Sequence, residues 1–355
     1  MWYFLGTKAL TQSKIMTKTN DMLKQNNRNL AIDSLKGFAI FLVCWGHSIQ
    51  FLKKDANSFF DNPLFILIYS FHMPLFMMIS GYLFFYSLRK DSLIGITRRR
   101  LFQLIVPSVS WFILESLLIN RDINIPNIKY GAVFPFWFLS SLFMTCITMA
   151  ISKFILKDSP WVFFILIFLT SLFFGDSWNM DRTKFLAPYF LLGFCAHYFM
   201  GLIERNRHWI GCISSMAWVI MLLFWDKEFY IYITKMTFHG VEFWHQLYVV
   251  VYRYAIGFFG SVSAIYLYSY TVSLRRFSLV AAYIGGYTLP IYIISTLTLW
   301  RIAGFIDVGH YLNNKIIYNL LATTLFASLI IIFCISIAAV LKKTSLTRFL
   351  FLGGR

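Results

Sequence analysis

Four ionisable side chains lie within long apolar segments of the sequence and are the first candidates for chemistry. They are His47 in "IFLVCWGHSIQ", His72 in "FHMPLFMMISGYLF", Glu115 in "VSWFILESLL" and Arg253 in "YVVVYRYAIGFFGS". An ionisable group in the hydrocarbon of a bilayer is costly, so it faces a protein interior or a polar cavity and marks a functional site. Imidazole also exchanges protons near neutral pH, which singles out the two histidines.

The composition indicates an integral membrane protein. Of the 355 residues 59% are hydrophobic and 13% are charged, with a mean hydropathy of +0.66, whereas soluble domains carry about a quarter charged residues. The net charge of +17 is therefore interpreted as a basic collar facing anionic membrane lipids, and no nucleic-acid partner is expected. The five cysteines lie in apolar segments and no HExxH or CxxC motif occurs, so no metal site is predicted.

The apolar runs predict an all-α polytopic bundle of about ten transmembrane helices. A helix needs about 20 residues to cross a bilayer. Runs near that length lie at 31–52, 63–87, 101–119, 134–152, 160–175, 184–203, 208–225, 246–271, 278–301 and 316–341. An even number puts both termini on one side, and the distribution of the 32 Lys and Arg residues puts that side in the cytoplasm. We expect an N-terminal cytoplasmic tail at 1–30, a transmembrane domain at 31–341 and a basic cytoplasmic C-terminal tail at 342–355.

In this orientation the four intramembrane residues share one depth. His47 follows Lys36 by eleven residues, which places it about 16 Å farther from the cytoplasm. His72, Glu115 and Arg253 fall in the same outer half. Each residue has a structural alternative: a histidine can bond to a carbonyl, Glu115 and Arg253 can form an ion pair, and Lys36 can reach the interface from within a span. The shared depth favours a functional cavity, which an enzyme or a transporter would have.

Five motifs occur in order along the chain. They are "RNLAIDSLKGFAIFLVCWGHS", "FHMPLFMMISGYLF", "RRRLFQLIVPSVSW", "FPFWFLSSLF" and "GGYTLPIYII", and they extend from about Arg28 to Ser295. Together they resemble the membrane-bound acyltransferase-3 family, in particular its fucose 4-O-acetylase-like branch. Any one of them recurs by chance in apolar sequences, but five in the family's order are a specific signal.

The resemblance implies an integral membrane O-acyltransferase of the bacterial inner membrane. Such enzymes usually move an acetyl group from cytoplasmic acetyl-CoA, the acyl donor, to a sugar hydroxyl of a cell-surface polysaccharide or a lipid-linked glycan. The implied partners are acetyl-CoA, a glycan or glycolipid acceptor and membrane lipids; neither nucleic acid nor metal is expected, and a homo-oligomer is compatible with the sequence. The coenzyme phosphates would contact a basic cluster formed by Lys36, Arg98, Arg99 and Arg100.

The resemblance also suggests roles for the residues within the membrane. His47 matches the family's histidine and would act as the general base toward the sugar hydroxyl, or would carry the acetyl group itself. His72 would bind the acceptor hydroxyl or polarise the thioester carbonyl. Arg253 would stabilise the oxyanion, and Glu115 would orient His47 or pair with Arg253.

Three further residues are candidates for binding the substrate. Ser80 and Tyr82 in "SGYL" can donate hydroxyl hydrogen bonds or pack helices together. Trp137 in "FPFWFL" can stack on a sugar or anchor its helix at the interface. Two positions differ from the family pattern: Lys36 replaces the usual Arg, which removes bidentate phosphate geometry, and Ser295 stands where His is frequent.

Two other classes of function stay open on the sequence alone. A solute transporter would use the same polar cavity, although the spacing of Lys36 and His47 would then be accidental and no internal repeat is evident. A scaffold or sensor would tolerate conservative replacement of the intramembrane charges. Replacing His47 by Gln discriminates among the three classes. An enzyme would lose its catalytic base completely, a transporter would keep part of its function because Gln is polar, and a scaffold would hardly change.

Overall fold

The computed structural model describes residues 30–52, 58–118, 132–173, 180–238, 241–271, 274–302 and 317–354, and its regular elements in these ranges are all helices. This confirms the predicted all-α class. In chain order the elements are the first helix (Leu30–Phe51), η1 (Ser58–Asp61), α2 (Pro63–Tyr69), α3 (His72–Lys90), α4 (Leu93–Arg100), η2 (Leu101–Ile105), α5 (Val106–Leu118), α7 (Trp137–Ile155), α8 (Pro160–Ser171), α9 (Met180–Cys195), α10 (Met200–Arg205), α11 (Arg207–Leu223), η3 (Lys227–Phe229), α12 (Phe243–Thr271), α13 (Arg275–Gly285), α14 (Thr288–Ile302), η4 (Ile317–Ala322), α16 (Thr323–Leu341) and α17 (Ser345–Leu352).

Six helical stretches of the described chain are long and apolar enough to cross a membrane, which supports a multi-pass membrane protein. They are the first helix, α2 with α3, α4 through α5, α7, α12, and η4 with α16. The pair α13 and α14 would make a seventh, but it is bent by 70° where the sequence predicts one span. The predicted count of ten is not confirmed, because α8, α9 and α11 have only 12, 16 and 17 residues. The side of the membrane that holds the termini stays a prediction.

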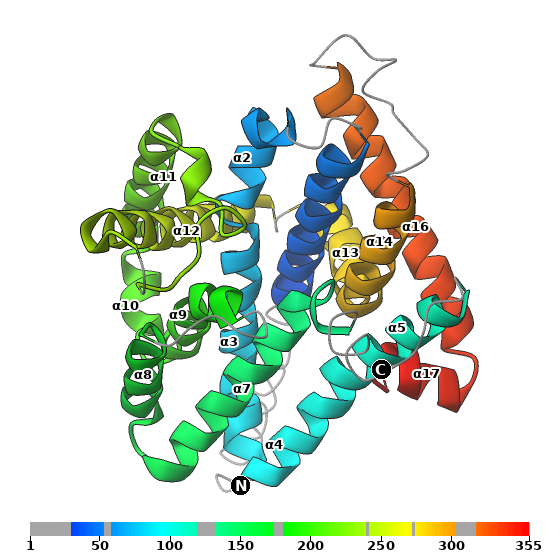
Figure 1. The fold of residues 1–355 in the computed structure, drawn as a ribbon, viewed down its shortest axis with the longest axis horizontal. Coiled ribbons are helices and arrows are strands. Elements are labelled where there is room, and N and C mark those ends of the chain that lie inside the picture. The colour runs from blue at the N-terminus through cyan, green and yellow to red at the C-terminus, as the bar shows by residue number, and fades with distance from the viewer. Residues whose placement is uncertain are drawn as a thin grey trace, which may run out of the picture.

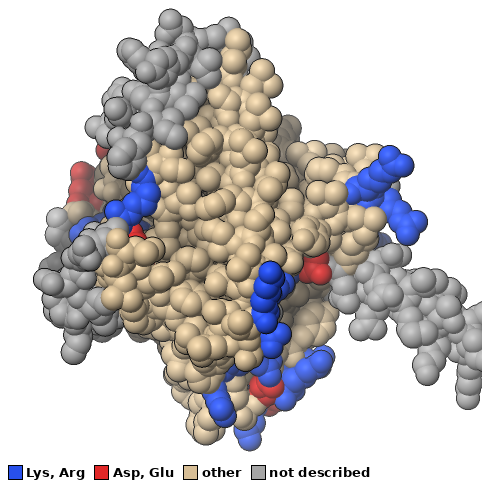
Figure 2. All heavy atoms as spheres, turned by 90° about the vertical axis from the view of Figure 1, so that its right-hand side faces the viewer, with Lys and Arg blue, Asp and Glu red and all other residues tan. Residues whose placement is uncertain are grey.

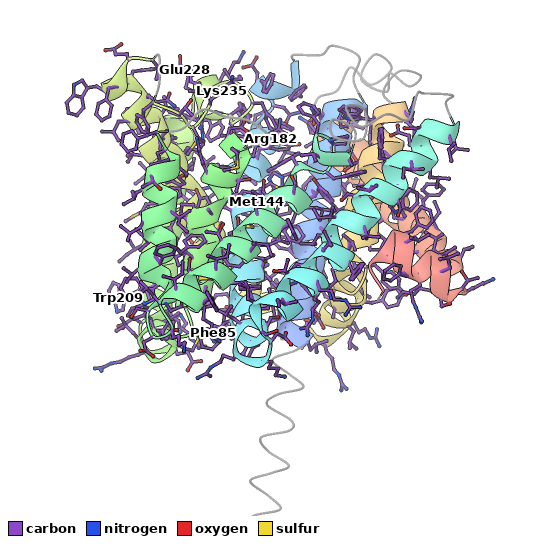
Figure 3. All side chains as sticks on the ribbon, turned by 60° about the horizontal axis from the view of Figure 1, so that its bottom comes forward. Phe85, Met144, Arg182, Trp209, Glu228 and Lys235 are labelled. Atoms are coloured by element: carbon purple, nitrogen blue, oxygen red, sulfur yellow. The ribbon has the colours of Figure 1, made fainter. Side chains whose placement is uncertain are left out.

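The helices run between two ends of the bundle (Figure 1 and Figure 3). Figure 3 places Phe85 and Trp209 at one end, which we name the basic end because cations such as Arg89, 5.0 Å above the Phe85 ring, gather there. Glu228 and Lys235 lie at the opposite end, named the loop end. In Figure 1 the first helix, in dark blue, passes between the α2–α3 pair and the α13–α14 pair. It is therefore an inner helix of the bundle.

Two glycines bring α3 and α9 into backbone contact. A Cβ built on Gly81 would lie 2.0 Å from the carbonyl oxygen of Phe190, and one built on Gly193 would lie 1.9 Å from the carbonyl oxygen of Met78. Both distances are far below any real contact, so only glycine allows this approach. Small residues at helix crossings are the usual means by which membrane helices associate, because lipid provides no hydrophobic driving force between them.

A second reciprocal pair fixes the first helix against α13. A Cβ on Gly37 would lie 1.8 Å from the carbonyl oxygen of Ala281, and a Cβ on Gly285 would lie 1.9 Å from that of Asp33. The contact lies beside Lys36 and immediately before the bend into α14. Close backbone contact with α13 therefore fixes the position of the first helix, which carries Lys36 and His47.

The outer surface is apolar. Most of the face in Figure 2 bears no charged side chain, and Lys and Arg lie toward its lower part and its sides. Most of the exposed side chains on α16 are large and apolar: Leu325, Leu329, Ile332, Phe333 and Val340. Such a surface is expected to face lipid.

The C-terminal segment, predicted as a basic tail at 342–355, includes the helix α17. This helix packs on α5, where the Trp111 indole N–H donates to the carbonyl oxygen of Phe351 at 3.1 Å and Leu352 is buried. It ends at Gly353, whose φ of 66° is a left-handed conformation that glycine adopts without strain. The segment is thus an integral part of the bundle surface.

Gly193→Ala should destabilise the protein, because the added methyl would overlap the Met78 carbonyl and push α9 away from α3. Overpacking of this kind typically costs about 1–3 kcal/mol. Thermal unfolding in detergent measures the loss, with Gly201→Ala as the matched control, since a Cβ at Gly201 meets no atom within 4 Å. Equal melting temperatures for the two variants would contradict the close packing of α3 and α9.

Candidate active site

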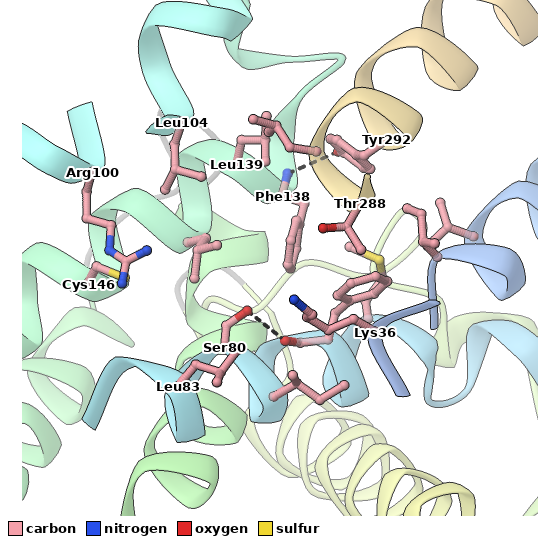
Figure 4. A pocket seen from close by; sticks show the side chains of 17 residues that line it. Lys36, Ser80, Leu83, Arg100, Leu104, Phe138, Leu139, Cys146, Thr288 and Tyr292 are labelled. Carbon is pink, nitrogen blue, oxygen red and sulfur yellow. Dashed lines mark hydrogen bonds between the residues drawn. The ribbon is translucent and has the colours of Figure 1, made fainter. Parts of the chain in front are cut away.

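A cavity of about 170 Å³ opens among the first helix, α3, α7 and α14. We name it the Lys36 cavity. Lys36 and Arg100 supply its cations, and Ser80, Phe138 and Tyr292 line other walls (Figure 4). The rest of its lining is almost entirely apolar. A mostly apolar slot with two cations at its border suits an extended apolar group that ends in an anion.

A second cavity, of about 270 Å³, lies toward the loop end and contains His47. We name it the His47 cavity. Aromatic side chains supply most of its wall: Phe51, Phe59, Phe60, Phe65, Tyr69, Phe134, Trp137, Tyr232, Tyr292 and Trp300. Its other polar lining residues are Gln50, Arg182 and Thr296. An aromatic cavity with a few convergent polar groups is typical of a site for an organic ligand.

The two cavities meet at Tyr292, which lines both of them. Its hydroxyl accepts a hydrogen bond of 3.4 Å from the backbone N–H of Phe138 (Figure 4). Trp137, the next residue, faces the His47 cavity, while Phe138 faces the Lys36 cavity. On the first helix Val43 lines the Lys36 cavity, and His47 lies one turn, about 6 Å, farther along. One helical turn and one tyrosine therefore separate the Val43 part of the Lys36 cavity from the imidazole, while Lys36 itself lies eleven residues before His47.

The imidazole of His47 has a buried nitrogen that is left unpaired. Its Nδ1 is buried, and no atom of the described residues hydrogen-bonds to it. The ring meets the Phe51 ring edge-on with centroids 5.9 Å apart. An unpaired buried nitrogen is rare in folded proteins, and at a residue that lines a cavity it marks a candidate for binding or catalysis.

His72 is buried and makes the structural contact that the sequence left open as an alternative. Its Nδ1 lies 2.8 Å from the carbonyl oxygen of Ile68, and because a carbonyl only accepts, Nδ1 donates. The ring packs against Tyr69 with centroids 4.6 Å apart. His72 lines a smaller neighbouring cavity and not the His47 cavity. The described part of the structure therefore shows no contact through which His72 would take part at His47.

Arg253 lies at the loop end and holds a turn of the chain. Its guanidinium donates to the carbonyl oxygens of Phe229 at 2.9 Å and of Glu228 and Thr234 at 3.0 Å. It also contacts the Met236 sulfur at 3.0 Å, and the side chain is 2% exposed. These bonds occupy its donors, so the structure gives no support to an oxyanion contact by Arg253. Its observed role is to position the segment 228–236.

Glu115 does not pair with Arg253. Its carboxylate lies 2.6 Å from the guanidinium of Arg301, at the end of α14, and both side chains are partly exposed. Neither cavity counts Glu115 among its lining residues. The suggested ion pair between Glu115 and Arg253 is wrong, and the orientation of His47 by Glu115 has no contact to support it. Shared depth along the membrane normal does not imply that two helices face each other.

The basic cluster divides into two parts. Lys36 and Arg100 line the cavity, with Lys36 also 2.6 Å from Asp33 and Arg100 bonded to Ser87 and Gln103 at 3.3 Å. The other two cations are exposed on the surface. Of these, Arg99 pairs with Asp91 at 2.7 Å, and Arg98 lies 5.8 Å above the Phe102 ring. Only two of the four predicted phosphate ligands therefore border the Lys36 cavity.

The three residues predicted to bind the substrate lie in three different environments. Ser80 lines the Lys36 cavity and donates to the Phe76 carbonyl at 2.8 Å. Tyr82 lies away from both cavities, with its ring stacked on that of His197 at 4.0 Å. Trp137 lines the His47 cavity, in keeping with the sugar-stacking alternative. The glycine between Ser80 and Tyr82 makes the close contact with α9, so the packing explanation accounts for this motif.

Sequence reasoning missed Arg182, the cation of the His47 cavity. It lies in the first turn of α9, just before the apolar run predicted at 184–203. The sequence therefore predicts that Arg182 belongs to an outer loop. Its guanidinium carbon lies 5.2 Å from the ring centroids of Phe134 and Trp137 and 5.4 Å from that of Tyr232. Burial raises the pKa of Tyr232 to about 12, against the opposing charge of Arg182, so this tyrosine is neutral at physiological pH. No local motif marks Arg182.

Among the described residues no group of three or more His, Cys, Asp or Glu side chains is arranged to hold a metal ion. The polar atoms of the two cavities are instead those of an organic site: ammonium, guanidinium, hydroxyl and imidazole. This set can bind an anion at one end and can accept a proton from a hydroxyl at the other.

Residues 29–341 match the acyltransferase-3 family model, described as an acyltransferase domain. The chain belongs to the acyltransferase-3 family.

The chain is also similar to two proteins named Nodulation protein NolL. The one from Mesorhizobium japonicum is 27% identical over 351 residues, with 90% of this chain and 87% of the relative covered. The one from Sinorhizobium fredii is 27% identical over 314 residues, with 82% and 83% covered. No solved structure matches the acyltransferase-3 chain. Family and helices together make the protein a membrane acyltransferase.

Arg253→Lys should loosen the segment 228–236, because an ammonium cannot bond to carbonyls on several sides at once. Loss of charged hydrogen bonds in a buried site should cost roughly 3 kcal/mol of stability. Hydrogen exchange would report faster exchange of amides in 228–236, and thermal unfolding would report the stability. The exposed Arg275→Lys is the matched control. Unchanged exchange in 228–236 would show that Arg253 does not hold the segment.

Proposed function

We propose that this protein is an O-acetyltransferase of the bacterial inner membrane. It transfers an acetyl group from acetyl-CoA to a sugar hydroxyl of a cell-surface polysaccharide or a lipid-linked glycan. One observation carries the proposal: a basic cavity and a cavity with an unpaired imidazole share one wall, Tyr292. Family membership supplies the reaction class, acyl transfer.

The Lys36 cavity is the donor site in this proposal. Lys36 and Arg100 bind the phosphates of the coenzyme, and the apolar walls take the extended arm that bears the thioester. Val43, one turn before His47, lines the deep part of this cavity on the first helix. A thioester at that depth reaches the Tyr292 wall while the nucleotide stays at the basic end.

The His47 cavity is the acceptor site. Its rings offer flat apolar surfaces on which the apolar face of a sugar packs, and Gln50 and Thr296 offer polar contacts to hydroxyl groups. The sugar enters from the loop end, on the side opposite to the cations. The acceptor therefore does not need to pass the donor.

The reaction in this proposal is a direct transfer with His47 as the base. The free nitrogen of His47 takes the proton of the sugar hydroxyl while the oxygen forms a bond to the thioester carbon. The tetrahedral intermediate then collapses, the C–S bond breaks, and the proton passes from His47 to the coenzyme sulfur. If His47 instead carries the acetyl group, the same cavity holds the acylated imidazole until the hydroxyl attacks.

His47→Gln should abolish most of the transfer. General-base help is typically worth about 10²–10⁴-fold, and Gln preserves polarity but cannot take the proton. Membranes that contain the protein would be supplied with acetyl-CoA labelled in the acetyl group, and label would be counted in extracted glycolipid and glycan. The exposed His208→Gln is the matched control and should transfer as the unaltered protein does.

The outcomes of this labelling experiment separate the alternatives. Transfer that survives His47→Gln would keep the enzyme and remove His47 as its base. Absence of transfer by the unaltered protein, in membranes with the native glycan, together with no binding of acetyl-CoA, would overturn the proposal and favour a transporter.

Arg100→Gln should weaken the use of acetyl-CoA without slowing the chemistry. A hydrogen bond to a charged group contributes about 1.5–3 kcal/mol, so KM for acetyl-CoA should rise roughly tenfold to a hundredfold with kcat nearly constant. Arg98→Gln is the matched control, because Arg98 is exposed and does not line the cavity. Equal KM values for the two variants would show that the Lys36 cavity is not the donor site.

A further inference from the structure

The His47 cavity holds a cation whose contacts differ from those of an ordinary buried arginine. The guanidinium of Arg182 lies against the faces of three rings, those of Phe134, Trp137 and Tyr232, at 5.2–5.4 Å. Ring faces attract a cation through their quadrupole. They do not replace the directional acceptors that guanidinium N–H groups normally have. The cage therefore fixes the position of the charge and leaves hydrogen-bonding capacity unused.

One donor of Arg182 is both buried and unpaired. Its Nε has no hydrogen-bond partner among the described residues. An unpaired buried donor costs about 1–3 kcal/mol, and such groups persist where a ligand uses them. His47, whose Nδ1 is unpaired in the same way, lines the same cavity. One cavity is thus lined by an arginine and a histidine that each have a buried, unpaired nitrogen.

The His47 imidazole and the Arg182 guanidinium match two requirements of acyl transfer: a base for the hydroxyl and a hydrogen-bond donor for the oxyanion. The imidazole serves the attacking hydroxyl, whereas the carbonyl oxygen of the thioester gains negative charge as the hydroxyl attacks. A positioned cation that donates a hydrogen bond to this oxygen stabilises the transition state more than the neutral ground state. Arg253 is engaged elsewhere, because its Nε and one amino group donate to backbone carbonyls and its other amino group contacts the Met236 sulfur.

We propose that Arg182, held by its aromatic cage, donates to the oxyanion that forms when the hydroxyl activated by His47 attacks the acetyl thioester. This inference rests on the proposed function. When the C–O bond forms, the carbonyl electron pair moves onto the oxygen that faces Arg182. When the C–S bond breaks, that pair returns to re-form the carbonyl of the ester. Arg182 stays protonated throughout.

The kinetic signature of this role is a loss in kcat. Removal of one oxyanion donor typically costs about 10²–10³ in kcat. Arg182→Gln should therefore lower kcat by roughly that factor, while KM for acetyl-CoA and for the acceptor stays within about threefold. Arg205→Gln, at an exposed position of α10, is the matched control and should change neither parameter.

Rescue by a small cation provides a second readout that a merely structural role would not change. Arg182→Ala leaves the three rings in place around an empty position, so added guanidinium should bind there and restore part of the kcat. Methylammonium should restore less, because it lacks the planar set of donors. Arg182→Lys keeps the charge and should keep the fold, which thermal unfolding checks, and should retain more activity than Arg182→Gln.

Three results would overturn the inference. If Arg182→Gln raises KM for the acceptor and leaves kcat intact, Arg182 binds an anionic group of the acceptor instead. If kcat falls only in step with the amount of folded protein and guanidinium rescues nothing, Arg182 is structural. If Arg182→Gln leaves transfer unchanged while His47→Gln abolishes it, the inference is wrong and the proposed function stands. The proposed function fails separately, when the unaltered protein transfers no acetyl group.

Discussion

Backbone contact at two pairs of glycines sets the geometry on which the site depends. Gly37 and Gly285 join the first helix to α13, and Gly81 and Gly193 join α3 to α9. The first helix carries Lys36 and His47, α3 carries His72, and α9 carries Arg182. In lipid these helices gain nothing by hiding apolar surface from one another, so the close fit of their backbones must hold them together. The first helix lines both cavities, so a shift of this helix would change both at once.

Arg253 and Arg182 show how differently the same side chain can serve one membrane protein. Arg253 is almost fully buried, and its donors are satisfied by the carbonyls of a turn, which makes it part of the scaffold. Arg182 is held by ring faces and keeps an unpaired Nε beside a cavity. The two are linked, because the turn that Arg253 holds contains Tyr232, one ring of the Arg182 cage. Arg253 thus positions Tyr232, and Tyr232 in turn helps to position Arg182.

What the sequence predicted well lies on single rigid elements. The apolar runs gave the all-α class, and the rise of a helix gave the separation of Lys36 from His47, because both stand on one helix. Predictions that needed two helices to face each other were less successful: Lys36 and Arg100 do border one cavity, but the suggested pair of Glu115 with Arg253 is wrong. Glu115 pairs with Arg301, 186 residues away, and depth alone carries no information about which side of a helix faces which neighbour. The position of Arg182 could not be predicted from the sequence, because the three rings that surround it lie on separate segments of the chain.

The placement of Tyr292 fits the proposed function, in which two hydrophilic substrates occupy two adjoining cavities. A charged nucleotide is costly to move through a bilayer, and so is a hydrophilic sugar. In the proposed mechanism neither has to cross, since the donor occupies the Lys36 cavity, the acceptor occupies the His47 cavity, and both reach the same tyrosine. Only the acetyl group passes that point, and it is small and uncharged. In this proposal the acetyl group crosses about one helical turn of protein, and Arg182, the proposed oxyanion donor, lies on the far side of it in the same cavity as His47.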